Sequence, residues 1–86
     1  MSRLITVYSK PSGCPQCVAT KRFLDSRGIG YEAISLADVE PVLMAHFRSM
    51  GHTEAPVVTV HDGDELLTNW SGFRPDLLAN HCTEEP

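Results

Sequence analysis

Short apolar runs alternate with helical patterns along the first half of the chain. Leu4–Tyr8 is nearly continuous in apolar and β-branched character, which predicts a central strand covered on both faces. From Cys17 onward, apolar residues share one arc of a 3.6-residue helix and charged residues the other, which predicts an amphipathic helix. The apolar arc comprises Ala19, Thr20, Phe23 and Leu24. Gly28 supplies a left-handed C′ position, so we expect the helix to end there.

The next segments repeat this order of a strand followed by a helix. Tyr31–Leu36 predicts a second short strand. Asp38 is a suitable N-cap and Pro41 falls in the first turn, where its missing N–H costs little, so a second helix is expected up to Gly51. Its apolar face comprises Val39, Leu43, Phe47 and Met50.

The last third of the chain predicts a hairpin and a short helix. Val57–Val60 and Glu65–Thr68 flank residues 61–64, whose Asp-Gly pair is a strong hairpin signal, so these strands should be antiparallel neighbours. Pro75 at the first helical position opens a helix that runs to about Cys82.

The resulting order is β-α-β-α-β-β-α, an α/β arrangement in which a four-stranded mixed sheet is flanked by three helices. This is the topology of the thioredoxin fold. The chain has 86 residues, enough for one domain, so we expect a single thioredoxin-like domain over residues 1–82. Residues 83–86 are expected to form a loose tail, and the protein to be a monomer.

Composition narrows the partners and the compartment. The formal net charge is −4 and no basic cluster is longer than Lys21-Arg22, which argues against a nucleic-acid partner. No stretch approaches the roughly 20 apolar residues that span a bilayer, so no membrane partner is expected. We expect the chain to be cytoplasmic, where thiols are kept reduced, so its three cysteines favour a catalytic pair with one cysteine to spare over a disulfide framework.

Cys14 and Cys17 form a Cys-Pro-Gln-Cys motif at the junction of the first strand and helix, a placement typical of a redox dithiol. Cys14 at the helix start faces unpaired N–H groups and the positive end of the helix dipole, so we expect it to be the nucleophile. Cys17, one turn later, is the expected resolving thiol. Pro15 suits the first helical position and Gly13 eases the turn before it. We expect this pair itself to be the redox centre, with no bound cofactor.

Three further residues have both a functional and a structural interpretation. Lys10, four residues before Cys14, either stabilises the thiolate by its charge or is simply solvated. Val18 falls on the polar arc beside the dithiol, where it is placed to contact partners, although single exposed apolar residues are common. Cys82, late in the last helix, is expected to be a half-buried small apolar side chain.

The most specific segment is Trp70–Asp76, with the sequence WSGFRPD directly after the hairpin. On its own it predicts a strand end, a glycine turn and a helix start, with Trp70 and Phe73 packing. In this setting, however, the chain resembles the NrdH-type redoxins, glutaredoxin-like small proteins that reduce class Ib ribonucleotide reductase. The resemblance extends over nearly the whole length. Its motifs are Tyr8-Ser9-Lys10-Pro11, the Cys-x-Gln-Cys site, Ala55-Pro56-Val57-Val58 and WSGFRPD.

The resemblance implies a role for the segment before the third strand. An Ala55–Pro56 bond would by itself be expected in the trans form. In the thioredoxin fold a cis-proline faces the dithiol, and Pro56 occupies the matching place. Ala55 would then offer its backbone N–H and C=O groups to an incoming peptide.

The resemblance also implies the reductant and the acceptor. The residues Trp70, Ser71, Gly72 and Phe73 would take the place where glutaredoxins hold glutathione. The protein would then be reduced by thioredoxin reductase, with NADPH as the ultimate donor, and would pass electrons to class Ib ribonucleotide reductase. Pro15 is glutaredoxin-like, whereas Gln16 replaces a tyrosine common in glutaredoxins. The loop before Cys14 has one residue more than the family pattern.

Three alternatives remain open from the sequence. One is a glutathione-dependent glutaredoxin, including the iron–sulfur-binding variety, and another is a general protein disulfide reductase. The third is a zinc site, for which Cys14, Cys17, His46 and His52 supply four possible ligands. The 28 residues between Cys17 and His46 are far from zinc-finger spacing, so we expect no metal site.

Overall fold

One mixed sheet organises the molecule. In a computed structural model that describes residues 3–82, four strands are arranged in the order β2-β1-β3-β4. Strand β1 (Arg3–Ser9) pairs in parallel with β2 (Glu32–Ser35) and antiparallel with β3 (Val57–Asp62). Strand β4 (Glu65–Ser71) pairs antiparallel with β3 and forms one edge. The predicted thioredoxin-like topology is confirmed.

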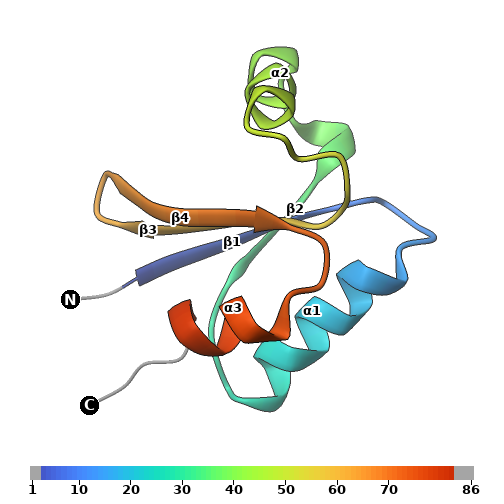
Figure 1. The fold of residues 1–86 in the computed structure, drawn as a ribbon. Coiled ribbons are helices and arrows are strands. Elements are labelled where there is room, and N and C mark those ends of the chain that lie inside the picture. Colours follow the sequence, from blue (N-terminus) through green and yellow to red (C-terminus); the bar gives the residue numbers. More distant parts are fainter. Residues whose placement is uncertain (1–2, 83–86) are drawn as a thin grey trace.

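The helices lie on both faces of this sheet (Figure 1). Helices α1 (Pro15–Ser26) and α3 (Pro75–His81) cover one face, and α2 (Pro41–Ser49) lies over the other. The main core cluster lies between the sheet and the α1–α3 layer: Ile5, Val7, Leu24, Val58, Val60, Trp70, Leu78 and Cys82. On the opposite face the rings of Tyr8 and Phe47 meet edge to face, with centroids 5.1 Å apart. Within residues 3–82, no helix is long and apolar enough to cross a membrane.

Helix α1 ends as its sequence predicts. Gly28 has φ +67°, its N–H donates to the carbonyl of Asp25 at 3.1 Å, and the Ile29 N–H donates to the carbonyl of Leu24 at 3.0 Å. This pair of bonds is a Schellman motif, which satisfies carbonyls that the helix end leaves without partners. The motif fixes the C-terminal end of the helix that carries the cysteines at its other end.

The start of α2 differs from the prediction. Asp38 is not an N-cap but ends a short 3-10 helix, Leu36–Asp38, whose start is capped by the Ser35 hydroxyl accepting from the Ala37 N–H at 3.2 Å. The α-helix begins only at Pro41. A residue before proline is disfavoured in the helical region, and Glu40 is extended with φ −65° and ψ 148°. Pro41 therefore sets the helix start and separates it from the 3-10 turn.

The hairpin strands are longer than predicted, because β3 continues past Val60 to Asp62, which pairs with Glu65, and β4 continues past Thr68 to Ser71. The connection is reduced to Gly63 and Asp64. Of these two only Gly63 has a positive φ, +63°, as a type II′ turn requires. The extension of β4 to Ser71 carries the chain to the end of the sheet where α1 begins.

Candidate active site

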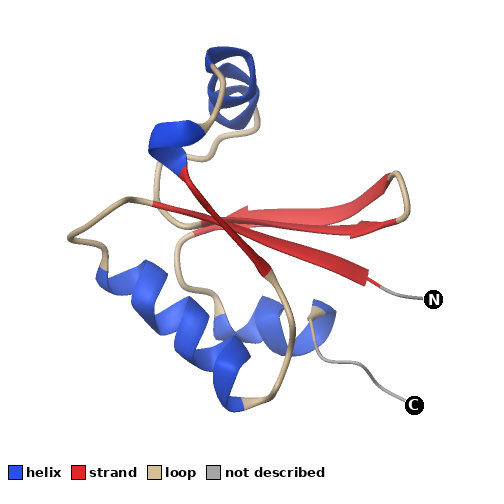
Figure 2. Ribbon diagram, turned by 180° about the vertical axis from the view of Figure 1, so that it is seen from behind, coloured by secondary structure: helices blue, strands red, loops and turns tan. Residues whose placement is uncertain are grey.

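Strand register brings three distant segments to one end of the sheet. Tyr8 is opposite Val57, and Val57 is opposite Ser71. The loop after β1, the segment before β3 and the loop after β4 therefore all lie at the same end of the sheet. Figure 2 shows this end from behind, with the loop from β1 leading into α1.

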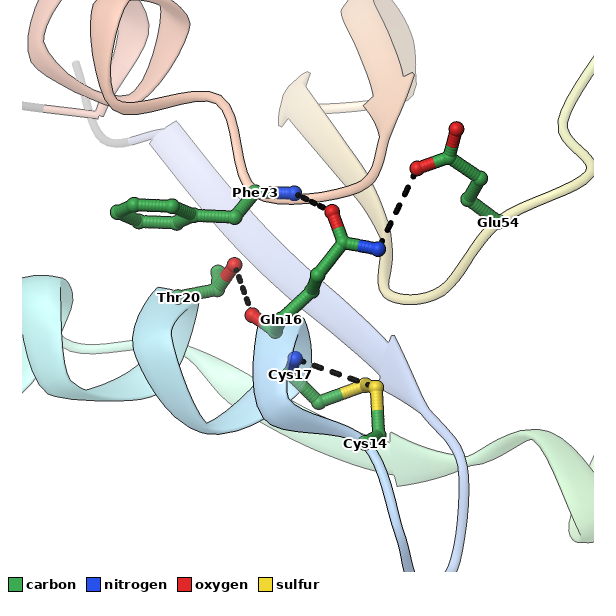
Figure 3. Close-up of a disulfide and its surroundings, with 6 residues drawn as sticks. All are labelled: Cys14, Gln16, Cys17, Thr20, Glu54 and Phe73. Atoms are coloured by element: carbon green, nitrogen blue, oxygen red, sulfur yellow. Dashed lines mark hydrogen bonds between the residues drawn. A yellow bond between two sulfur atoms is a disulfide. The ribbon is translucent and has the colours of Figure 1, made fainter.

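The two cysteines lie at this end and form a disulfide, with Cα atoms 5.2 Å apart (Figure 3). Cys14 is the N-cap of α1 and is partly exposed, whereas Cys17 is only 3% exposed. The Cys17 N–H donates to the Cys14 Sγ at 3.2 Å. A free N–H directed at this sulfur, together with the helix dipole, favours a thiolate at Cys14 over one at Cys17. Pro15 occupies the first helical position, as predicted.

Three of the predicted site residues near the cysteines are exposed. Val18 is 50% exposed on α1, and Gly13 has φ +67° in the exposed loop before the helix. Lys10 is exposed and lines a groove of about 360 Å³ with Phe47, Ala55 and others. The groove lies beside the segment before β3. Lys10 is therefore on a groove wall next to the site, whichever role its charge has.

The Ala55–Pro56 bond is cis, as predicted. Both residues are buried, so their side chains are not available for contact with a partner. The Pro56 carbonyl accepts a hydrogen bond from the Gly72 N–H at 2.9 Å. This bond ties the cis-proline segment to the loop that follows β4.

Residues 70–73, the WSGF segment, are buried or half-buried. Trp70 is 4% exposed and belongs to the core cluster, and Ser71 is the last residue of β4. Gly72 is buried with φ +80°, and Phe73 packs against the core cluster. Of this segment, the backbone at Gly72 and Phe73 is linked to the site through Pro56 and Gln16, whereas the Trp70 side chain belongs to the core.

Gln16 connects the two loops across the site. Its amide nitrogen donates to Glu54 Oε1 at 3.3 Å, and its Oε1 accepts from the Phe73 N–H at 3.0 Å. Its backbone carbonyl accepts from the Thr20 hydroxyl at 2.9 Å. In Figure 3 the Gln16 side chain lies between Phe73 and Glu54, above the disulfide. Gln16 is identified by the Cys-x-Gln-Cys motif, whereas Glu54 belongs to no motif and is an exposed glutamate in a loop, so the sequence does not indicate its role.

The start of α3 carries a closed charge pair. Arg74 is the N-cap residue, and its Nη2 lies 3.1 Å from Asp76 Oδ2. A second bond joins Arg74 Nε to Asp76 Oδ1 at 3.3 Å. Hydrogen bonds from Arg74 hold the pKa of Asp76 below its usual value, and the same bonds raise the pKa of Arg74. Both groups are exposed, so the pair contributes little to the free energy of unfolding. Its main effect is that the two charges neutralise each other at the start of α3.

The remaining thiol and the histidines lie elsewhere. Cys82 is 2% exposed, more buried than expected, and burial raises the pKa of its thiol to about 11. His46 is exposed on α2, and a ring nitrogen of His52 lies 2.6 Å from Asn69 Oδ1. Across residues 3–82 no group of three or more histidine, cysteine or acidic side chains is arranged to hold a metal ion.

This arrangement has the parts that thiol–disulfide exchange needs. The more accessible sulfur, Cys14, can attack a disulfide, and Cys17 is close enough to displace the product by re-forming the bond seen here. The cis-proline segment leaves the sheet at the same end as the cysteine-bearing loop.

The chain is similar in sequence to glutaredoxin and to glutaredoxin-like proteins, as the geometry of the site suggests. The family model for glutaredoxin matches residues 5–65. The glutaredoxin-like protein NrdH of Salmonella typhimurium is 39% identical over 86% of this chain and 83% of its own length, and that of Escherichia coli K12 is equally similar.

Solved structures agree as well. The NrdH-redoxin from Escherichia coli superposes with a TM-score of 0.76 and 37% identity, covering 96% of this chain and 99% of the other. A thioredoxin-like protein superposes with a TM-score of 0.62 and 26% identity, covering 88% and 96% of the two chains.

Proposed function

Since this chain belongs to the glutaredoxin family of thiol–disulfide oxidoreductases, and within it to the NrdH type, we propose that it carries electrons from thioredoxin reductase to class Ib ribonucleotide reductase. NADPH is the ultimate donor in this proposal. The relative from Escherichia coli is described as having a thioredoxin-like activity profile, which supports an enzyme as reductant in place of glutathione.

The observation that carries the choice of reductant is the start of α3. Glutathione has two carboxylates, which are best received by a helix N-terminus and a basic side chain. Here the helix N-terminus already bears Asp76, and the guanidinium of Arg74 is bound to that carboxylate. The charge that would attract glutathione is therefore already neutralised within the protein.

The proposed exchange has two steps. The Cys14 thiolate attacks one sulfur of the acceptor disulfide, so that a Cys14–acceptor disulfide forms and the other acceptor sulfur leaves as a thiolate, which takes up a proton. The Cys17 thiolate then attacks Cys14 Sγ and releases the second acceptor thiol. Two electrons pass to the acceptor, and the protein is left with the Cys14–Cys17 disulfide.

We propose that the acceptor docks at the face around the disulfide. The acceptor peptide would pair with the backbone of Ala55, which precedes the cis-proline, and contact the exposed Val18 side chain. We place the exchange in the cytoplasm, where thiols are kept reduced. One monomer with a domain over residues 1–82 and no bound cofactor is sufficient for it.

The direct test is a reconstituted electron chain. Oxidised protein is mixed with NADPH, thioredoxin reductase and a class Ib ribonucleotide reductase, and deoxyribonucleotide formation is measured alongside NADPH oxidation. We expect both to depend on the protein and to stop with Cys14→Ser. Efficient reduction by thioredoxin reductase without deoxyribonucleotide formation would limit the function to a general protein disulfide reductase. If thioredoxin reductase did not reduce the oxidised protein, the proposed reductant would be wrong.

A further inference from the structure

The Gln16 side chain forms hydrogen bonds with two different loops at the site. It spans the site from the loop after β4 to the segment before β3, with one hydrogen bond at each end. We call Gln16, Glu54 and the Phe73 N–H the amide clamp. Gln16 lies between Cys14 and Cys17 in sequence, and the clamp lies above the disulfide in Figure 3.

Two consecutive backbone donors in the loop after β4 already have partners. The Gly72 N–H donates to the Pro56 carbonyl at 2.9 Å, and the Phe73 N–H donates to Gln16 Oε1 of the clamp at 3.0 Å. Successive N–H groups of this kind are general receptors for carboxylates. A carboxylate that approached them would have to displace the Gln16 amide oxygen.

The clamp also sets a negative charge at the same place. Glu54 Oε1 accepts a hydrogen bond from the Gln16 amide at 3.3 Å, which holds the exposed carboxylate beside the loop. Gly72 leaves room for it: a Cβ at this position would lie 2.7 Å from Glu54 Oε1 and 3.1 Å from Gln16 Oε1. The clamp thus depends on a residue without a side chain at position 72.

We propose that the amide clamp determines specificity by excluding small anionic thiols from Cys14. A thiol such as glutathione must bring its carboxylates next to the disulfide, where it meets an occupied N–H group and a carboxylate of like charge. A polypeptide that pairs with the backbone of Ala55 does not need the Phe73 N–H. This inference rests on the proposed function, because it explains how one site accepts a protein reductant and rejects glutathione.

The excluded reaction is a balanced exchange. A glutathione thiolate would attack Cys14 Sγ, break the Cys14–Cys17 bond and leave Cys17 as a thiolate that takes up a proton. A second glutathione thiolate would attack the bound glutathione sulfur, giving oxidised glutathione and a Cys14 thiol. The clamp acts on the first step, because that step places glutathione at Cys14.

The experiment compares glutathione with the neutral thiol 2-mercaptoethanol. The rates at which each forms a mixed disulfide with the oxidised protein are measured by mass spectrometry, and their ratio is the readout. Gln16→Ala frees the Phe73 N–H and releases Glu54, so the ratio should rise about tenfold, the value of one hydrogen bond. Glu54→Gln keeps an oxygen that accepts from Gln16 but removes the charge, so the ratio should rise a few-fold. Asn80→Ala, which removes an exposed amide on α3, is the matched control and should leave the ratio unchanged.

The outcomes separate this inference from the proposed function. If the ratio is unchanged in both clamp variants, the clamp does not determine specificity. If both thiols react faster by the same factor, the variants only loosen the site, and the inference is likewise wrong. The Gln16→Ala/Glu54→Gln double variant should gain less than the product of the single effects, because both act through one clamp. The proposed function is tested on the wild-type electron chain and stands or falls independently of these ratios.

Discussion

At the scale of single residues, the two cysteines differ mainly in access. Cys14 is partly exposed at the N-cap, and Cys17 is 3% exposed one turn into α1. Sequence reasoning anticipates this difference, because it depends only on the position of each residue in a local helix start. It does not anticipate Glu54, whose importance arises from a contact with Gln16, 38 residues away in the chain.

The first prediction concerns the order in which the cysteines act. Cys17→Ser should accumulate a stable mixed disulfide between Cys14 and the acceptor, because no second thiolate can displace it. Cys14→Ser should lower single-turnover reduction of a protein disulfide to background. Mass spectrometry of the trapped species identifies the linked cysteine. A trapped adduct on Cys17, or full single-turnover activity in Cys14→Ser, would reverse the assignment.

A second prediction follows from the buried third cysteine. Burial raises the pKa of the Cys82 thiol from 9.0 to about 11, while the charge of Arg3 lowers it in part. Because the folded pKa lies above the unfolded one, the stabilisation is complete below pH 9 and is lost as the pH rises from 9 to 11. The free energy of unfolding of the wild type should therefore fall over this range by on the order of 2 kcal/mol more than that of Cys82→Ala.

Denaturant unfolding at several pH values checks this difference. The pKa values of Tyr8 and Tyr31 are also raised by burial, but their effects are common to both proteins and cancel in the comparison. Parallel pH profiles would show that the thiol ionises freely in the folded state. Cys82→Ala should retain disulfide reductase activity, since this buried thiol lies apart from the Cys14–Cys17 pair.

At the scale of elements, local signals predict some boundaries and miss others. The end of α1 at Gly28 and the start of α3 at Pro75 were predicted because each depends on residues within one turn. The start of α2 was not, because Asp38 and Pro41 both suit a helix start and the prediction gave the N-cap to Asp38. The following proline keeps Glu40 extended, so the α-helix can begin only at Pro41.

The third prediction compares two glycines with positive φ. Gly72→Ala and Gly28→Ala should each lower the free energy of unfolding by about 1–2 kcal/mol, the cost of a left-handed backbone with a side chain. Only at Gly72 would the new Cβ meet other atoms, at 2.7 Å from Glu54 Oε1, and the flexible glutamate side chain should move away. Gly72→Ala should therefore also raise the rate with glutathione, whereas Gly28→Ala should not. Equal glutathione rates in the two variants would contradict this.

At the scale of the whole molecule, the site exists only because of the strand order. Positions 14, 56 and 72 come together because Tyr8, Val57 and Ser71 are opposite one another across β1, β3 and β4. Neither hydrophobic periodicity nor turn signals specify that β1 pairs with β3. The resemblance to a known family supplied this arrangement in advance, and with it the cis form of the Ala55–Pro56 bond.

The last prediction concerns the reductant and the charge of the molecule that it meets. The chain has a formal net charge of −4, and the Arg74 guanidinium is bound to Asp76. Reduction of the oxidised protein should therefore be fast with NADPH and thioredoxin reductase and negligible with glutathione and its reductase. Added salt should raise the slow glutathione rate but leave the rate with a neutral thiol unchanged, because salt screens repulsion between like charges.

Two variants with the same change in net charge locate the effect. Asp76→Asn releases Arg74 at the start of α3, so glutathione should react several-fold faster, about the gain of one exposed charge contact near a helix N-terminus. Asp64→Asn removes one negative charge in the hairpin turn and should change the rate little. Equal acceleration in both variants would show that net charge alone repels glutathione. Wild-type rates with glutathione that match those with thioredoxin reductase would instead place the protein among the glutathione-dependent glutaredoxins, because the paired Arg74 would then not hinder glutathione at all.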